Sequence, residues 1–128
     1  MPVKYSIDTQ HSLVYTVFSG KVTDADFDHH LQSLSSDARF EPAMPELVDL
    51  RAVTKVSLSA HTIPSSARWK LHAPRAQRAV VAPTDFLFGL ARMYQSHLGE
   101  ASESHFMVFR TLPPALAWLG LEAEPSLL

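Results

Sequence analysis

The feature that most restricts the fold is a run of apolar residues, Ala79-Val80-Val81-Ala82, that stops at Pro83. A short apolar run with no polar face is typical of a strand that other layers cover on both sides. Thr84 follows with a side chain that can cap a helix, and the helical pattern continues to about Leu98, before Gly99. A buried strand followed directly by a helix predicts an α/β fold with a mostly parallel sheet.

Other strand and helix signals complete this pattern. Residues 3–8 alternate apolar and polar side chains, and residues 13–19 form a second strand-like segment after a short polar turn, which predicts an antiparallel hairpin. Further strands are expected over residues 47–50, 79–82 and 106–109, and helices are expected to begin near Thr23, Ile63, Thr84 and Thr111. The predicted fold class is α/β, with a mixed, mostly parallel sheet of about five strands in the order ββαβαβαβα and an antiparallel N-terminal hairpin.

Length and composition favour one domain. A chain of 128 residues, 46% of them hydrophobic, can bury a core without further support. We expect a single domain over residues 1–120 and a C-terminal tail over residues 121–128. The sequence has no signal-peptide pattern and no apolar run near the ~20 residues of a membrane span, so we expect a cytoplasmic protein without a membrane span.

The charge balance argues against a nucleic-acid partner. The formal net charge is −2, and the basic residues are scattered along the chain. Proteins that bind DNA or RNA concentrate Lys and Arg to neutralise phosphates. We therefore expect no binding of nucleic acid.

No catalytic or metal-binding signature is present in the sequence. The absence of cysteine excludes disulfides, thiolate metal sites and cysteine nucleophiles, and there is neither a G-x-S-x-G elbow nor a glycine-rich phosphate loop. Asp26 and His30 are four residues apart on one helix, and we interpret them as a solvated boundary pair. We expect no catalytic residue, no metal and no cofactor. A small hydrolase or isomerase built on Asp49 and a histidine stays as an alternative.

Polar residues near the predicted strand ends form one candidate site. Asp49 interrupts an apolar strand, so its carboxylate needs a partner or a wet edge. Arg51 projects from the same face, and Arg78 enters what should be a neighbouring strand. Two interpretations remain open: an ion pair that holds the strand ends together, or a ligand-binding rim at the carboxyl ends of the strands. The candidate rim comprises Asp49, Arg51, Thr84, Asp85 and Arg110.

The helix that begins near Thr84 has an unusually broad apolar side. Its apolar residues span an arc of about 160°, whereas an ordinary surface helix has a stripe of roughly 100°. Phe88 lies outside even this arc. Such a surface predicts contact with a neighbouring helix, with an apolar ligand or with another subunit in a homodimer. The candidate ligand or partner surface comprises Phe86, Phe88, Met93, Tyr94, Leu58, Ile63 and Trp69.

The order of elements and four segments resemble the STAS family, which is named for anti-sigma factor antagonists and sulfate transporters. The segments are residues 47–53, 79–94, 108–110 and 115–120. The chain is most similar to the SpoIIAA-like branch, whose fold is also compared with the CRAL-TRIO lipid-transfer domain. The resemblance spans about residues 3 to 120 and implies a binding or regulatory module without enzymatic activity.

A phosphorylation site is a second implication of the resemblance. The antagonists carry a phosphorylatable serine in an Asp-Ser-Ser-Gly-like turn after the third strand. In this chain Leu58 occupies the position of that serine and Ala60 replaces the glycine, whereas a shift of one residue nominates Ser57 or Ser59. The first hypothesis is a module that binds a protein partner or an apolar small molecule, and the alternative is a phospho-regulated switch.

Overall fold

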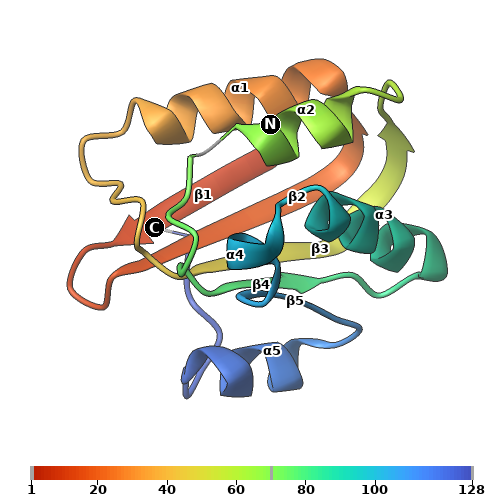
Figure 1. The fold of residues 1–128 in the computed structure, drawn as a ribbon. Helices are drawn as coiled ribbons and strands as arrows, with labels where there is room; N and C mark the ends of the chain where they lie inside the picture. Colours follow the sequence, from red (N-terminus) through yellow and green to blue (C-terminus); the bar gives the residue numbers. More distant parts are fainter. Residues whose placement is uncertain (1, 70, 128) are drawn as a thin grey trace.

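The computed structural model describes residues 2–69 and 71–127. Within these ranges the chain forms one five-stranded sheet with strands in the order β1-β2-β3-β4-β5 (Figure 1). The elements are β1 (Val3–Asp8), β2 (Leu13–Thr23), α1 (Asp24–Ser35), β3 (Glu46–Ser57), α2 (Thr62–Arg68), β4 (Arg78–Val81), α3 (Asp85–Ser96), α4 (Glu100–Glu103), β5 (Phe106–Phe109) and α5 (Leu112–Leu119). β1 pairs antiparallel with β2, and the other neighbouring strands are parallel. The predicted mixed sheet with an N-terminal hairpin is confirmed.

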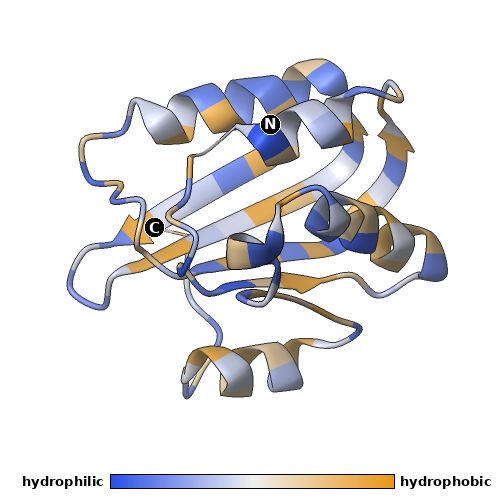
Figure 2. Cartoon of the chain, in the orientation of Figure 1, coloured by the Kyte–Doolittle hydropathy of each residue, from blue (hydrophilic) through white to orange (hydrophobic). Residues whose placement is uncertain are grey.

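Helices cover both faces of the sheet. α1, α2 and α3 lie on one face, and α5 lies on the opposite face (Figure 1). From β2 to β5 the strands lie side by side in the order of the chain, so each crossover runs in the same direction along the sheet. Right-handed crossovers then place the connecting helices on a common face. In Figure 2, α1 carries hydrophilic and hydrophobic segments in alternation, as expected of a helix with one buried side.

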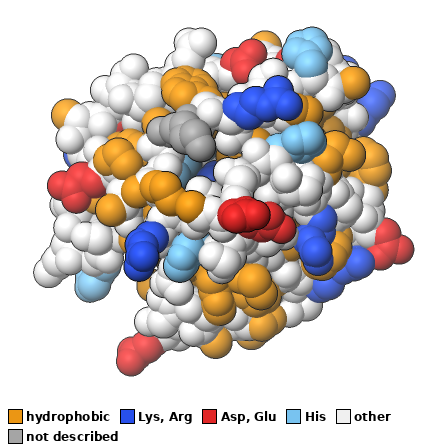
Figure 3. Space-filling model, viewed as in Figure 1, with side chains coloured by type: hydrophobic (Ala, Val, Ile, Leu, Met, Phe, Trp, Pro, Cys, Tyr) orange, Lys and Arg blue, Asp and Glu red, His pale blue; other side chains and the backbone are white. Residues whose placement is uncertain are grey.

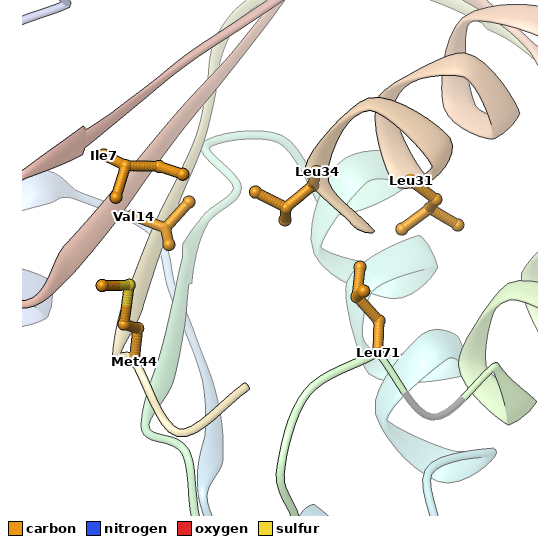
Figure 4. Packing of buried hydrophobic residues seen from close by; sticks show 6 residues of the cluster. All are labelled: Ile7, Val14, Leu31, Leu34, Met44 and Leu71. Carbon is orange, nitrogen blue, oxygen red and sulfur yellow. The ribbon is translucent and has the colours of Figure 1, made fainter. Parts of the chain in front are cut away.

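The apolar run at β4 is covered on both sides, as its sequence predicts. Ala79 and Val81 pack in a core cluster with Ala115 of α5, whereas Val80 and Ala82 pack with Leu87 of α3. Successive side chains of a strand point to opposite faces, which explains this division. A third cluster joins the N-terminal hairpin to α1 and consists of Ile7, Val14, Leu31, Leu34, Met44 and Leu71, whose side chains point toward one another (Figure 4).

Several boundaries differ from those predicted. β2 continues to Thr23 and β3 to Ser57, because the two strands stay paired beyond the register shifts near Ser19 and Gly20. Gly20 has a φ of 63°, a conformation that glycine adopts without steric strain. α3 ends at Ser96 rather than Leu98, and the short helix α4 was not predicted.

Candidate functional site

A cavity of about 120 Å³ lies between the sheet and helices α1, α2 and α3, and it is partly open to solvent. We call it the helix-side cavity. Its wall is mostly apolar: aromatic rings come from Phe18, Phe27 and Phe106, and aliphatic side chains come mainly from β3 and α3. The half-buried residues Val53, Val56 and Leu58 lie toward the carboxyl end of β3. Five polar or partly polar residues complete the wall, namely His30, Glu46, His72, Arg78 and Tyr94.

Two of the polar wall residues, Arg78 and His72, lie against the buried carboxylate of Glu46. Glu46 and Arg78 begin β3 and β4, and the register of the two parallel strands places them side by side. Arg78 Nε lies 3.3 Å from Glu46 Oε1, and Thr16 Oγ1 donates to Glu46 Oε2 at 2.9 Å. Arg78 Nη2 also donates to the Tyr94 hydroxyl at 3.2 Å. A buried ion pair with further hydrogen bonds is therefore built into the polar end of the cavity.

His72 lies against the same carboxylate. Its Nε2 is 3.2 Å from Glu46 Oε1, and its side chain is only 7% exposed. The imidazole ring is not aligned for a hydrogen bond to this oxygen, so the buried Nε2 has no hydrogen-bond partner among the described residues. An unpaired buried polar atom costs free energy unless another group satisfies it.

The electrostatics leave one positive and one negative charge in this cluster. Burial by itself raises the pKa of Glu46, but the His72 and Arg78 contacts outweigh it and hold the pKa below the ordinary 4.5. Burial, followed by the Arg78 charge, lowers the pKa of His72 from 6.5. Burial also lowers the pKa of His30 from 6.5. At neutral pH both imidazoles are therefore neutral, and Glu46 and Arg78 are the charged groups.

His30 corrects one prediction. The residue is only 6% exposed, and its ring packs at 5.6 Å between centroids against both Tyr5 and Phe18. Asp26, its supposed partner, instead accepts a hydrogen bond from the Thr23 backbone N–H at 2.9 Å in the capping box of α1. The interpretation as a solvated pair is wrong, because α1 turns the histidine toward the sheet.

The candidate surface on α3 is divided by the structure. Leu58, Ile63 and Tyr94 line the helix-side cavity. The outward side chains are Phe86, which is 61% exposed, Met93, which is 47% exposed, and Trp69, which is 43% exposed. The buried side of α3 is centred on Leu87 and Ala91, so the apolar arc points less toward Phe86 than predicted.

The surroundings of Phe88, which the sequence leaves open, are settled by the packing of α3. Phe88 lies outside the predicted arc, yet it is half-buried and packs beside the core cluster of β4, α3 and β5. The guanidinium of Arg110 lies 4.3 Å from the centre of its ring. α3 sits close enough to β5 for both flanks of its buried side to be covered, which a helical projection cannot show.

The strand-end residues form two separate ion pairs. Arg51 Nε and Nη2 donate to the Asp49 carboxylate at 3.0 Å and 2.7 Å, and Arg51 also contacts Glu124. The Tyr15 hydroxyl donates to Asp49 at 3.2 Å, and burial together with the Asp49 charge raises the pKa of Tyr15 to about 12. Asp49 shares the α5 face of β3 with Leu47, so this cluster lies across the sheet from the cavity.

The rest of the rim stabilises local structure. Arg110 Nη1 donates to Asp85 at 2.7 Å on the surface, and the Thr84 hydroxyl accepts from the Leu87 backbone N–H at the start of α3. Arg78 does begin the strand that neighbours β3, as predicted, but its side chain pairs with Glu46. The rim residues thus do not converge on one site.

The two candidate phosphorylation sites differ in their surroundings. Ser57 ends β3 and is exposed. The Ser59 hydroxyl donates to Asp24, which also accepts from Thr62 Oγ1 at 2.6 Å, so these contacts join the start of α1 to the start of α2 and to the loop before it. The hydrogen bonds from Ser59 and Thr62 lower the pKa of Asp24 to about 2. A phosphate on Ser59 would bring two negative groups together.

Glu46 and His72 are candidate functional residues that the sequence does not single out. A charged residue is rare at a buried position, so nothing in the local sequence marks Glu46 as part of a buried strand. The one available signal was that Glu46 and Arg78 stand directly before two apolar strand segments that are neighbours in the predicted parallel sheet. The visible face in Figure 3 has interspersed charges of both signs.

Of three comparisons with known proteins, the one with solved structures bears on the fold. No protein-family model and no curated protein sequence matches the chain. Among solved structures, it is similar to an uncharacterised protein from the DUF3478 family with a SpoIIAA-like fold, from Shewanella loihica PV-4. The TM-score is 0.60 at 17% sequence identity, and the match covers 91% of this chain and 93% of that chain.

The fold therefore defines the class. The chain is an α/β protein with a SpoIIAA-like fold, and the structural likeness that its sequence predicted is confirmed. In the residues that the structure describes, no helix has the length and apolar character to cross a bilayer.

Proposed function

We propose that the protein is a non-enzymatic module that binds a small apolar molecule in the helix-side cavity. The observation that carries this proposal is the cavity itself, about 120 Å³ in volume, with a largely apolar wall and access to solvent. An engineered apolar cavity of about 150 Å³ in another protein binds benzene. The helix-side cavity is of comparable size and accommodates one ring or a short branched chain.

The wall of the cavity supports binding rather than catalysis. Among the described wall residues none is a serine or threonine, so no hydroxyl nucleophile of that kind faces the cavity. Glu46 is held by Arg78 and Thr16, which leaves it poorly placed to act as a base toward a ligand. The histidines lie at the polar end without a nucleophile beside them.

A cavity-filling variant tests the proposal. Ala91 is buried on α3 and lines the cavity, so Ala91→Leu is expected to remove most of the space for a ligand. Ala117 is exposed on α5, and Ala117→Leu is the matched control. Saturating benzene is expected to raise the Tm of the wild type and of the control by a few degrees, but not that of Ala91→Leu.

Mass spectrometry gives an independent measurement. The purified wild-type protein, sprayed under native and then denaturing conditions, is expected to lose the mass of a small apolar compound that Ala91→Leu does not carry. Equal benzene stabilisation of wild type and Ala91→Leu would show that the helix-side cavity is not the binding site.

A further inference from the structure

We infer that the helix-side cavity takes an uncharged ligand of about one ring with a single hydrogen-bonding group, as in a phenol or a small cyclic alcohol, and excludes carboxylates. This inference rests on the proposed function and adds the chemical class of the ligand. Three features of the polar end support it: the paired charges, the unused hydrogen-bonding groups and the size of the space.

The charges at the polar end are already matched. Arg78 Nε lies 3.3 Å from Glu46 Oε1, and its Nη2 donates to Tyr94 at 3.2 Å. The guanidinium carbon also lies 5.4 Å and 5.3 Å from the ring centres of Tyr94 and Phe106. A ligand carboxylate would have to share this one cation with Glu46, and bringing a second negative charge beside a buried carboxylate is strongly unfavourable.

A cationic ligand meets the opposite difficulty. One oxygen of Glu46 accepts from Thr16 and the other lies beside Arg78, so both oxygens have partners. An ammonium group at the same place would lie beside the Arg78 guanidinium. The cluster therefore offers neither a free anion nor a free cation to a charged ligand.

The unused hydrogen-bonding groups are neutral. His72 Nε2 is buried without a hydrogen-bond partner among the described residues. The Tyr94 hydroxyl accepts from Arg78, and its own proton is donated to no other described residue. Both residues line the cavity, as does the neutral imidazole of His30. A ligand hydroxyl both donates and accepts, so it complements these groups without adding charge.

The space limits the buried part of the ligand. A volume of about 120 Å³ is filled by one ring, and the aromatic wall residues Phe18, Phe27 and Phe106 offer faces and edges for it to pack against. A long acyl chain exceeds this volume. The opening to solvent allows a short substituent on the ring to project outward.

A headgroup series on the wild-type protein tests the inference. Benzene, phenol, benzoate and benzylamine share one ring and differ in the group attached to it, and their dissociation constants are measured by NMR titration at about pH 7.5, where both histidines are neutral. Phenol is expected to bind about tenfold more tightly than benzene, as one hydrogen bond provides. Benzoate and benzylamine are expected to bind at least about tenfold more weakly than phenol.

The outcomes separate the inference from the proposed function. If benzoate or benzylamine binds as tightly as phenol, the inferred ligand class is wrong. The same holds if phenol binds no more tightly than benzene. In both cases the cavity remains a binding site. Binding of none of the four compounds would overturn the proposed function and the inference with it.

A variant gives a second test with an internal control. Glu46→Gln keeps the shape and the Thr16 contact but leaves Arg78 without its anion. Benzoate is then expected to gain at least about tenfold in affinity relative to benzene measured on the same variant, so that any loss of cavity integrity, which weakens both ligands, does not enter the comparison. If Glu46→Gln binds benzene but binds benzoate no better than the wild type does, the role assigned to the Glu46–Arg78 pair is wrong.

Discussion

Glu46 and Arg78 are the residues whose placement most affects the rest of the molecule. Each begins a strand, and parallel pairing in register brings the two side chains together beneath the helices. Removing both charges by isosteric neutral groups changes little in general, whereas removing one leaves the other buried and unpaired. The pair is therefore a sensitive point of the fold as well as the polar end of the cavity.

Arg78→Met tests this dependence. The change leaves Glu46 buried without its cation and is expected to lower the free energy of unfolding by about 3–5 kcal/mol. The double variant Glu46→Gln with Arg78→Met is expected to recover part of that loss, because no charge stays unpaired. Urea denaturation measures both. A single variant within about 1 kcal/mol of wild type would show that the pair carries little weight.

Acid is expected to destabilise the protein first through its buried histidines. Burial lowers the pKa of His30 and His72 from 6.5 in the folded state, so the unfolded chain binds more protons once the pH falls below 6.5. The free energy of unfolding therefore decreases as the pH is lowered below 6.5. Glu46, whose pKa is held below 4.5, adds a second loss at lower pH.

The variant His30→Phe measures how much His30 contributes to this loss of stability in acid. Phenylalanine keeps the ring packing against Tyr5 and Phe18 but cannot take up a proton, so the free energy of unfolding is expected to fall less steeply just below pH 6.5. His29→Gln is the matched control, because His29 is exposed on the same helix. Thermal unfolding at a series of pH values measures the slopes, and an identical slope in His30→Phe and wild type would contradict the account.

At the scale of single residues, the sequence predicted partners only where they are close along the chain. Asp49 and Arg51 are two residues apart on one face, and they do form an ion pair. Glu46, Arg78 and His72 come from three segments, so their meeting depends on strand register and on the path of the loop after α2. A single sequence does not fix either of these.

The elements show the same contrast. Strong local signals placed α3 well: Thr84 caps it and Asp85 begins it. The direction of its buried side depends on contacts with β4 and β5, so a helical projection of the sequence places Phe86 on the apolar side and leaves the exposure of Phe88 open. A rotation of the helix by a fraction of a turn exchanges which aromatic residue is covered.

Two alanine substitutions test the observed orientation of α3. Phe88→Ala removes a half-buried ring from the core edge and is expected to cost about 2 kcal/mol of unfolding free energy. Phe86→Ala removes an exposed ring and is expected to change it by no more than about 0.5 kcal/mol. Chemical denaturation of the two variants compares them directly. A larger loss for Phe86→Ala than for Phe88→Ala would mean that the helix is turned the other way.

At the scale of the whole molecule, the fold followed from one physical requirement. A strand with no polar face needs cover on both sides, and right-handed connections then determine where the helices lie. The helix-side cavity could not be predicted from this requirement, because it is the space left where three helices and a curved sheet pack imperfectly. Its volume depends on side chains from seven elements, which no local pattern encodes.

The most direct test of the account is a titration of methyl-labelled protein with benzene, followed by carbon–proton correlation NMR. Saturable shifts are expected at Val48, Leu50, Leu87 and Leu90, which line the cavity. Leu112 and Leu116 pack on the α5 side of the sheet and are expected to stay unchanged. An absence of saturable shifts, or equal shifts on both faces of the sheet, would contradict the claim that this cavity is a binding site.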